Sequence, residues 1–431
     1  MDGSSRKFIH KPRTRSKAFE TQLVFRLIYF EKQRENLKFE LSTAPTATTN
    51  TSFKEQNSSV GDAHIMQFSI QREVLLKPLQ QVVGVVERRQ TLPVLANLLV
   101  RVVDGRLSLT GTDLEVEMVA STEAEKLEDG DITIPARKLF DIVRALPDGA
   151  RIDMKLNGDR VALSAGRSRF TLATLPASEF PTIDEIELVE KVSLPEEVLR
   201  ELMERTAFAM ANQDVRYYLN GMLLDLQEHT LRCVATDGHR LALKETRLDS
   251  KVSSRRQIII PRKGVNELVG LFETGDGMVE LEFGRNHLRV RRGDVVFTSK
   301  LIDGRFPDYE AVIPLGADKH ATLDREVLRG ALQRAAILSN EKYRGVKLEL
   351  SPGKLRLVAH NPEQEEAVEE VEADTVVSDL SVGFNVGYLL DALAALRGDK
   401  ARLSLRDAQS SCLVQEDDNE ESRHVIMPLR L

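Results

Sequence analysis

Apolar residues recur at helical spacing after each of three copies of one tripeptide. Glu-Val-Leu occurs at positions 73–75, 197–199 and 326–328. After each copy, apolar side chains recur every three or four residues, as they do on the buried face of a helix. The three sets are Leu75, Leu79, Val82 and Val86; Val198, Leu202 and Phe208; and Leu328, Leu332, Ala335 and Leu338. The pattern predicts three amphipathic helices, the third with Asp324 as its N-cap.

A pair of alternating strands follows each predicted helix. In the first copy, residues 98–102 and 107–110 flank Asp104-Gly105, a dipeptide typical of tight hairpin turns. The counterparts are residues 221–226 with 231–234, and residues 346–350 with 355–358 around Pro352-Gly353. The second strand of each pair ends just before Asp113, Asp237 and Asn361, which are 124 positions apart each time. This constant spacing predicts three copies of one structural unit.

A second, shorter helix is predicted in each copy, over residues 139–146, 265–272 and 388–396. Glycine and aspartate follow it, and then another hairpin, such as residues 150–156 with 160–164. Each repeat of about 125 residues therefore holds two helices and two sets of strands. The predicted fold class is α+β, with three similar domains at residues 66–189, 190–317 and 318–431, each a duplicated helix-plus-strands unit.

Composition narrows the class of protein. Of the 431 residues, 42% are hydrophobic and 29% charged, which is typical of folded globular proteins. Lys and Arg number 60 against 67 Asp and Glu, so a uniformly basic nucleic-acid binder is excluded while a locally basic surface is not. The two cysteines, Cys233 and Cys412, fit neither a disulfide framework nor a zinc site and suit a reducing cytoplasm. The predicted location is cytoplasmic.

The first 65 residues differ from the rest. They hold eleven Lys and Arg against seven Asp and Glu, while the remainder has a net charge of −11. Residues 41–60 are rich in Thr, Ser, Asn and Ala without helical or strand periodicity, which is typical of a disordered linker. We expect residues 1–65 to be a disordered appendage or an upstream mis-assigned start, with the folded protein beginning at Met66. The basic residues 3–19 leave a transit peptide as the alternative.

Motifs for catalysis are sparse. The sequence has no Walker-type phosphate loop, no dinucleotide-binding glycine motif, no zinc-protease motif and no nucleophile elbow, so no cofactor is expected. Asp237 and His239 could form a catalytic pair in which one side chain is the base and the other orients it. The position equivalent to His239 holds Glu115 in the first repeat and Glu363 in the third, so the histidine does not recur. A turn in which Asp237 caps backbone N–H groups is the preferred interpretation. The acidic residues 363–372 are interpreted as a solvated or partner-facing strand, with a cation site as the alternative.

Several blocks resemble one known family. They are LSLTGTDLE at 107–115, QDVRYYLNGM at 213–222, ATDGHRL at 235–241, FTSKL at 297–301, DGRFPDY at 303–309 and MPLRL at 427–431. Through these blocks the sequence from Met66 to Leu431 resembles the bacterial DNA polymerase III beta subunit, the sliding clamp family. The resemblance implies a non-catalytic processivity factor: a ring-shaped homodimer that encircles duplex DNA regardless of sequence, with helices lining the hole and sheets outside. It also implies that the replicative polymerase, the clamp loader and other proteins with clamp-binding motifs are partners.

The family's functional positions fall on three sets of residues in this chain. The implied DNA contacts are Arg89, Arg137, Gln213, Tyr217 and Tyr218. The implied groove for partner peptides is Leu219, Thr236, Gly238, His239, Arg240, Leu241, Pro307, Val312, Val425, Met427, Pro428 and Leu429, with Asn385, Tyr388 and Ser411 beside it. The implied dimer interface is Lys138, Arg160, Arg167, Arg169, Phe170 and Leu172 on one side, and Ile337, Leu338, Glu363, Glu365, Glu366 and Glu369 on the other. Further basic candidates on the inner helices include Arg72, Arg205 and Lys263.

Two positions depart from the family pattern, and two alternative functions remain open at this point. Ala311 stands where relatives often carry a basic residue, and Val368 interrupts the glutamate run. The first alternative is a DNA-processing enzyme that binds a metal through the acidic run. The second is a clamp-like scaffold that binds peptides but not DNA.

Overall fold

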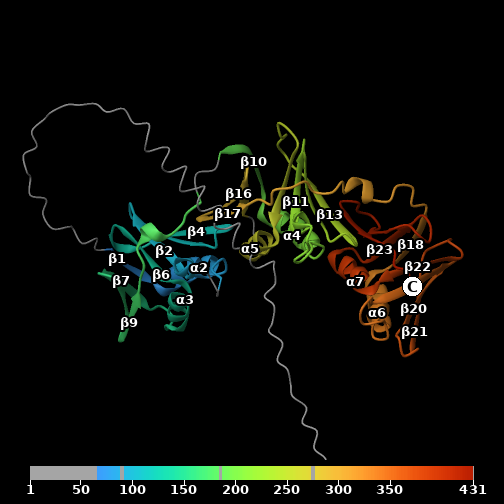
Figure 1. The fold of residues 1–431 in the computed structure, drawn as a ribbon, viewed down its shortest axis with the longest axis horizontal. Helices are drawn as coiled ribbons and strands as arrows, with labels where there is room; N and C mark the ends of the chain where they lie inside the picture. Colours follow the sequence, from blue (N-terminus) through green and yellow to red (C-terminus); the bar gives the residue numbers. More distant parts are fainter. Residues whose placement is uncertain (1–65, 88–91, 184–186, 273–276, 431) are drawn as a thin grey trace, which may run out of the picture. The chain divides into compact units, whose positions relative to one another are not determined.

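One unit, a strand followed by a helix and three further strands, occurs six times in the described part of the computed structural model (Figure 1). The structure describes residues 66–87, 92–183, 187–272 and 277–430. The predictions for residues 1–65 and for Arg89 therefore lie outside the described residues. We refer to residues 66–189, 190–317 and 318–431 as the first, second and third repeat, and each contains two of the units.

The elements of the first repeat are β1 (Gln67–Gln71), α2 (Arg72–Val82), β2 (Asn97–Val103), β3 (Arg106–Thr112) and β4 (Val116–Glu123), then β6 (Gly130–Pro135), α3 (Ala136–Ala145), β7 (Arg151–Asn157), β8 (Arg160–Ala165) and β9 (Ser168–Ala173). A short strand, β5 (Glu125–Glu128), lies between the two units. Single turns of 3-10 helix, η1 (Pro93–Ala96) and η2 (Ala177–Glu179), complete the repeat.

The elements of the second repeat are β10 (Leu188–Pro195), α4 (Glu196–Ala207), η3 (Tyr217–Leu219), β11 (Gly221–Gln227), β12 (Thr230–Thr236) and β13 (Arg240–Arg247), then β14 (Arg256–Pro261), α5 (Arg262–Leu271), β15 (Met278–Gly284), β16 (His287–Arg292) and β17 (Val295–Lys300), followed by η4 (Glu310–Val312). Those of the third are β18 (Lys319–Asp324), α6 (Arg325–Ala336), β19 (Gly345–Ser351), β20 (Lys354–His360) and β21 (Glu366–Glu372), then β22 (Leu380–Asn385), α7 (Val386–Ala395), β23 (Lys400–Leu405), β24 (Cys412–Glu416) and β25 (Ser422–Ile426).

The helices lie where the apolar periodicity predicts them, but their ends differ. The predicted apolar series extend to Val86, Phe208 and Leu338, whereas α2, α4 and α6 end at Val82, Ala207 and Ala336. The shorter helices α3, α5 and α7 begin two or three residues earlier than predicted. The first turns of α3 and α5 carry polar residues such as Arg137 and Lys263, which contribute nothing to an apolar period, and α7 begins with Val386 and Gly387 before the predicted start at Tyr388. The predicted N-cap is confirmed, since the Asp324 carboxylate accepts the N–H of Val327 at 2.9 Å. Among the described helices, none is long and apolar enough to cross a membrane.

The helices pack in pairs and bury their apolar faces against the strands. Within each repeat α2 contacts α3, α4 contacts α5, and α6 contacts α7 (Figure 1). Leu75 and Leu79 of α2 and Leu199 of α4 are fully buried, and Leu332 of α6 is 1% exposed. Burying one such side chain is worth about 1.5–3 kcal/mol. The predicted apolar faces are therefore the core faces.

Two eight-stranded sheets are each shared between consecutive repeats. Their strand orders are β10-β15-β16-β17-β4-β3-β2-β6 and β14-β11-β12-β13-β25-β24-β23-β18. In the first, β17 pairs antiparallel with β4, with Phe297 opposite Met118. In the second, β13 pairs antiparallel with β25, with Leu241 opposite Val425. Backbone hydrogen bonds thus join the first repeat to the second and the second to the third.

The two remaining sheets end in strands that have no partner strand on their outer side within the described residues. Their orders are β5-β1-β7-β8-β9 and β21-β20-β19-β22. In the repeated unit, β9 is the counterpart of β17 and β25, and β21 is the counterpart of β4 and β13. Each of the two strand types that pair at the internal boundaries is therefore also found once at a sheet edge, as β9 and as β21.

Ion pairs reinforce both internal boundaries. At the first, Lys263 of α5 donates to the Asp113 carboxylate, to Glu87 at 2.8 Å and to the Val85 carbonyl at 3.1 Å. Although burial opposes the charge, these partners raise the pKa of Lys263. At the second, the buried Arg205 of α4 donates to the Ala395 carbonyl at 2.6 Å and pairs with Glu416 of the third repeat at 3.4 Å, while Glu201 of its own helix lies at 3.0 Å. Because its guanidinium is buried and engaged, Arg205 is not available for DNA.

A buried histidine lies at the second boundary. His424 of β25 is 1% exposed, its Nε2 lies 3.2 Å from the Ser422 hydroxyl, and its Nδ1 has no hydrogen-bond partner within the described residues. Its ring centre lies 5.7 Å from that of Phe208. Burial, followed by the nearby positive charges of Arg205 and Lys244, lowers the pKa of His424 to about 3. The imidazole is therefore neutral in the folded protein at neutral pH.

This buried imidazole predicts a pH dependence of stability. A histidine in the unfolded chain has a pKa near 6.5, so below that pH the unfolded state binds a proton that the folded state does not bind. Between pH 7.5 and pH 5 the free energy of unfolding should fall by about 2 kcal/mol from this group alone. Urea unfolding of the variant His424→Gln should show a correspondingly smaller loss over the same range. The variant His239→Gln, which removes an exposed histidine, should keep the wild-type loss; equal pH dependence in all three proteins would contradict the assignment.

Candidate functional site

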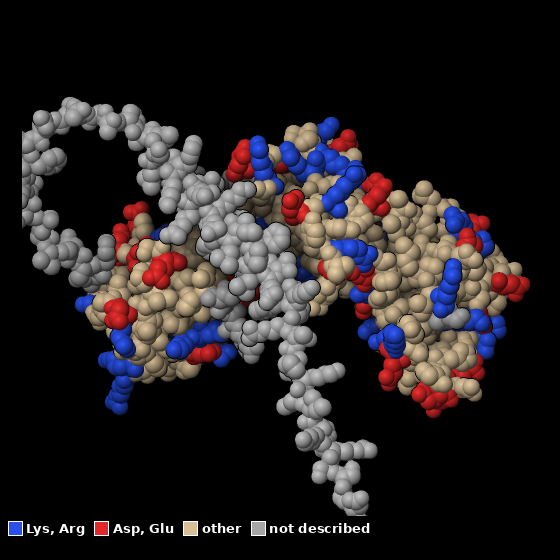
Figure 2. Space-filling view, viewed as in Figure 1, with Lys and Arg blue, Asp and Glu red and all other residues tan. Residues whose placement is uncertain are grey.

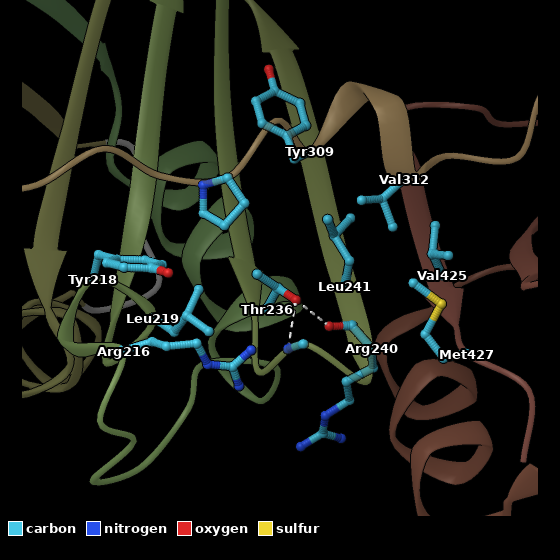
Figure 3. Close-up of a pocket in the computed structure, with 12 residues that line it drawn as sticks. Arg216, Tyr218, Leu219, Thr236, Arg240, Leu241, Tyr309, Val312, Val425 and Met427 are labelled. Carbon is cyan, nitrogen blue, oxygen red and sulfur yellow. Dashed lines mark hydrogen bonds between the residues drawn. The ribbon is translucent and has the colours of Figure 1, made fainter.

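An apolar hollow lies at the boundary between the second and third repeats, beside the paired strands β13 and β25 (Figure 3). Its volume is about 190 Å³. The residues that line it are Arg216, Tyr218, Leu219, Thr236, Gly238, Arg240, Leu241, Pro307, Tyr309, Val312, Val425 and Met427. We call this hollow the groove.

The interior of the groove is built from aliphatic side chains of both repeats. Leu219 and Leu241 come from the second repeat and Val425 from the third, and all three are at most 3% exposed. Leu241 and Val425 face each other across the β13–β25 ladder, and Met427 lies at the rim with 38% of its surface exposed. An open hollow of this composition favours apolar and aromatic side chains, because their burial removes apolar surface from water. The flexible thioether of Met427 can adapt to different occupants.

A tight turn after β12 forms one wall of the groove. The Asp237 carboxylate accepts the N–H groups of His239 at 2.9 Å and Arg240 at 3.0 Å. The Thr236 hydroxyl donates to the Arg240 carbonyl at 2.6 Å and accepts the N–H of Gly238 at 3.1 Å (Figure 3). Gly238 has φ +89°, a conformation that favours glycine. The interpretation of Asp237 as a turn cap is confirmed.

Arg240 connects the groove to the third repeat. Its guanidinium pairs with Asp237 at 3.1 Å and with Asp391 of α7 at 2.5 Å, and it donates to the Phe208 carbonyl at 2.7 Å. It also lies over the rings of Tyr388, at 4.6 Å from the ring centre, and of Phe208, at 5.2 Å. Charge pairing and cation–π contact hold one side chain against two repeats at once. A shift of the third repeat against the second would therefore change the width of the groove.

Arg216 closes the groove at its lower edge in Figure 3. Its guanidinium forms a bidentate pair with Asp214, at 3.0 and 2.8 Å, and donates to the Asp237 carbonyl at 3.0 Å. Hydrogen bonds from the Arg216 side chain and backbone lower the pKa of Asp214 to about 2. A methyl group added at Gly238 would lie 2.8 Å from this guanidinium, so glycine also permits the close packing of Arg216 on the turn.

Tyr309 forms the far wall of the groove, and its hydroxyl points away from the hollow (Figure 3). The hydroxyl donates to the fully buried Asp225 at 2.7 Å. Asp225 also accepts bonds from Arg255, at 3.0 and 2.5 Å, and from Gln257 at 2.9 Å. Burial would raise the pKa of Asp225, but these donors outweigh it and hold the pKa below its ordinary value. Burial and Asp225 raise the pKa of Tyr309 to about 12, so the ring is fixed by a permanent donor.

The structure brings together nine of the residues expected in the groove: Leu219, Thr236, Gly238, Arg240, Leu241, Pro307, Val312, Val425 and Met427. Six others do not line the hollow: His239, Asn385, Tyr388, Ser411, Pro428 and Leu429. Among them, Tyr388 packs under Arg240 and Asn385 caps α7 through the N–H of Gly387 at 2.8 Å. Arg216 and Tyr309 line the groove without having been predicted, although both lie inside blocks that carry the family resemblance, 213–222 and 303–309, which is the signal that could have pointed to them.

The residues expected to contact DNA lie on separate elements. Arg137 is exposed in the first turn of α3 and donates to the Val86 carbonyl at 2.9 Å. Gln213 and Tyr217 share the loop between α4 and β11, where Gln213 has φ +56° and Tyr217 is 58% exposed. Tyr218 packs edge-on against Tyr217 at 5.8 Å between ring centres but also lines the groove. The DNA assignment of these residues stays a prediction.

Most of the residues expected at the dimer interface lie on or beside the two free sheet edges, and Lys138 is exposed on α3. Arg169 and Phe170 lie on β9, Arg160 begins β8 and Arg167 is in the turn between them, while Leu172 is buried in the core of its own chain. On the other side, Glu366 and Glu369 lie on β21, Glu363 and Glu365 precede it, and Ile337 is 77% exposed at the end of α6. The two edges therefore carry opposite charges. Over the visible face of the whole molecule, by contrast, basic and acidic side chains are interspersed (Figure 2).

The acidic run does not gather its carboxylates around one point. Glu369 pairs with Arg334 of α6 at 2.7 Å, and Glu370 pairs with Lys354 at 2.9 Å. The hydrogen bond from Arg334 lowers the pKa of Glu369, which keeps that carboxylate ionised. Among the residues that the structure describes, no three His, Cys, Asp or Glu side chains are grouped so as to hold a metal ion.

Three family models match the chain in sequence. They describe the N-terminal, central and C-terminal domains of the DNA polymerase III beta subunit and match residues 66–184, 193–308 and 310–430. Together they span both sides of the groove and both free sheet edges.

Curated relatives and solved structures agree with these models. The beta sliding clamp of Pseudomonas putida is 55% identical over 367 residues, 85% of this chain and all of that relative, and the one from Escherichia coli is 48% identical over the same shares. The crystal structure of the DNA polymerase III subunit beta from Pseudomonas aeruginosa matches with a TM-score of 0.84 at 54% identity, over 85% of this chain and all of that one. These findings do not support the alternative of a metal-dependent DNA-processing enzyme. The chain belongs to the DNA polymerase III beta subunit family, the beta sliding clamps, which are processivity factors and not enzymes.

Proposed function

We propose that two copies of this sliding clamp join head to tail into a closed ring around duplex DNA, and that the groove tethers polymerases, the clamp loader and other proteins through short peptides. The observation that carries the proposal is the pair of free sheet edges, β9 and β21. The proposal places the protein in the cytoplasm with the DNA it encloses, and takes residues 66–189, 190–317 and 318–431 as its three domains.

The free edges support a dimer because they are the counterparts of strands that already pair. At each internal boundary, the last strand of one repeat (β17 or β25) pairs with the fourth strand of the preceding repeat (β4 or β13). The strands left over are β9, of the same type as β17 and β25, and β21, of the same type as β4 and β13. Pairing β21 of one copy with β9 of another would repeat the same junction. Two such pairings use every edge of this type and close a ring.

Charge and apolar surface also favour this junction. The β9 side carries Arg160, Arg167 and Arg169, and the β21 side carries Glu363, Glu365 and Glu366. Opposite charges on two edges guide the encounter and disfavour pairing of like edges. The exposed Ile337 beside β21 is an apolar side chain that an interface would remove from water.

Enclosure explains how a protein with net charge −7 can remain on DNA. A closed ring cannot leave a circular duplex, so its contacts with phosphates can be few and weak, which permits sliding. Arg137, Gln213 and Tyr217 are exposed candidates for such contacts, and Arg89 is carried over from the family resemblance. Basic and aromatic side chains suit contacts to the backbone that carry no sequence information.

The dimer predicts a mass in solution of two chains. Replacing Ile337 and Leu338 by alanine removes apolar surface from the proposed interface, so the dimer dissociation constant from analytical ultracentrifugation should rise at least tenfold. The matched control replaces Val215 and Leu315, which are 95% and 85% exposed and lie away from both free edges, and it should leave the constant unchanged. A wild-type monomer, or an undiminished dimer of the Ile337→Ala, Leu338→Ala variant, would count against the proposed interface.

Enclosure predicts that retention depends on the topology of the DNA. After loading onto nicked circular DNA by its loader, the wild-type protein should stay bound in high salt and be lost when the circle is cut once. Gel filtration of labelled protein before and after cutting provides the measurement. A scaffold that binds only peptides would not be retained on the circle, and an enzyme would convert the DNA in a metal-dependent reaction; either result would refute the proposal.

The groove predicts a difference between two substitutions of Tyr309. Tyr309→Ala removes the far wall and should weaken binding of a fluorescein-labelled peptide with adjacent leucine and phenylalanine at least tenfold, measured by fluorescence anisotropy. Tyr309→Phe keeps the ring and should leave the affinity within about threefold, while the free energy of unfolding falls by about 1 kcal/mol because Asp225 loses one donor. Equal peptide affinity in the alanine variant and the wild type would show that the groove is not the binding site.

A further inference from the structure

A short loop between α6 and β19 presents two cations and a tyrosine to solvent. Lys342, Tyr343 and Arg344 are all exposed, and the Lys342 ammonium lies 5.2 Å from the centre of the Tyr343 ring. Glu341 is the only carboxylate among residues 339–344. Within the described residues neither Lys342 nor Arg344 forms an ion pair. The arginines of the preceding helix differ in this respect, since Arg325, Arg329 and Arg334 each pair with a glutamate.

The backbone of this loop is held by side-chain amides. The Asn340 side-chain oxygen accepts the N–H groups of Lys342 at 2.9 Å and Tyr343 at 3.0 Å. The Arg344 N–H donates to the Asn340 carbonyl at 2.7 Å, and Asn385 donates to the Tyr343 carbonyl at 3.2 Å. Arg344 has φ +46°, a conformation that is uncommon for arginine. The charged side chains are thus presented from a fixed backbone, which lowers the entropy cost of using them in binding.

The loop has a counterpart in the second repeat. The Arg344 carbonyl accepts the N–H of Val386 at 2.8 Å, and the Asn220 carbonyl accepts the N–H of Arg262 at 3.0 Å. Both members of the first pair lie 124 positions after those of the second. Each loop leads from the first helix of its repeat into a strand that begins with glycine, Gly221 or Gly345. The second-repeat loop is the one that carries Gln213 and Tyr217.

We propose that residues 342–344 form a further contact with the sugar–phosphate backbone of the enclosed DNA. The inference rests on the proposed ring, in which equivalent loops of successive repeats occupy equivalent places around the duplex. Lys342 and Arg344 would neutralise phosphates, and the Tyr343 ring and hydroxyl would contact sugars. The other possible occupant is a peptide, because the neighbouring Asn385 is one of the residues that the family resemblance places beside the groove. DNA is favoured because the loop offers cations and no aliphatic side chain, whereas the groove is mainly aliphatic.

The test measures how DNA affinity depends on salt. The probe is a fluorescein-labelled primed duplex, and its dissociation constant for the full chain is followed by anisotropy from about 50 to 200 mM NaCl. Each lost phosphate contact should lower the slope of log affinity against log salt by about 0.9. The variant Lys342→Ala, Arg344→Ala should therefore lose between one and two units of slope and bind several-fold more weakly at 50 mM. Replacement by Lys342→Arg and Arg344→Lys should retain the wild-type slope.

A charge-matched control separates direct contact from the change in net charge. Lys354→Ala with Arg356→Ala removes the same two charges from β20, where both residues pair with glutamates, and should leave the slope unchanged. Equal slopes in the loop variant and the wild type, or equal losses in the loop variant and the control, would overturn the proposal. So would a loss of labelled-peptide affinity in the loop variant, which would assign the loop to the groove. A wild-type chain that is not a dimer would instead overturn the ring on which the proposal rests.

Discussion

Antiparallel pairing of sheet edges across repeat boundaries is the interaction on which the rest of the structure depends. A strand at a sheet edge presents a row of unpaired N–H and C=O groups that favours any complementary strand. In this chain β17 pairs with β4 and β25 pairs with β13, and both ladders are continuous over five residue pairs. Each repeat thus completes a sheet that its neighbour begins. The same requirement, applied to β9 and β21, is the physical reason for the proposed pairing of two chains.

The groove is a consequence of one of these ladders. Pairing of β13 with β25 places Leu241 opposite Val425, two residues that are 184 positions apart in the sequence. Arg240, the first residue of β13, then reaches Asp391 and Tyr388 of the third repeat. A site formed at a junction depends on the junction for its shape. Peptide binding and the fit between repeats are therefore expected to be thermodynamically linked.

Two groups of cations can be distinguished in the described part of this protein, those paired at the boundaries between repeats and those exposed without a carboxylate partner. The internal boundaries use buried or half-buried cations, Lys263 at the first and Arg205 at the second, each held by carboxylates and backbone carbonyls. A buried cation that loses such partners is strongly destabilising, so these residues fix the arrangement of the repeats and are lost to DNA binding. Exposed cations without carboxylate partners, such as those at 342 and 344, are the ones that remain for phosphates.

The sequence alone determined the threefold repeat, the helices and the hairpins, because apolar periodicity and turn residues act over short stretches of chain. Its errors are local as well: α3 and α5 begin earlier than predicted because their first turns carry polar residues, and α7 begins two residues earlier, at Val386. Nine of the residues that the family resemblance assigns to a peptide groove line one hollow in the structure, while their role in peptide binding stays a prediction. Only the tertiary structure decided that Arg216 and Tyr309 complete the groove, that Arg205 is buried, and that β9 and β21, the counterparts of the strands paired at the internal boundaries, lie at sheet edges. Those facts depend on contacts between residues far apart in the chain, which no local pattern records.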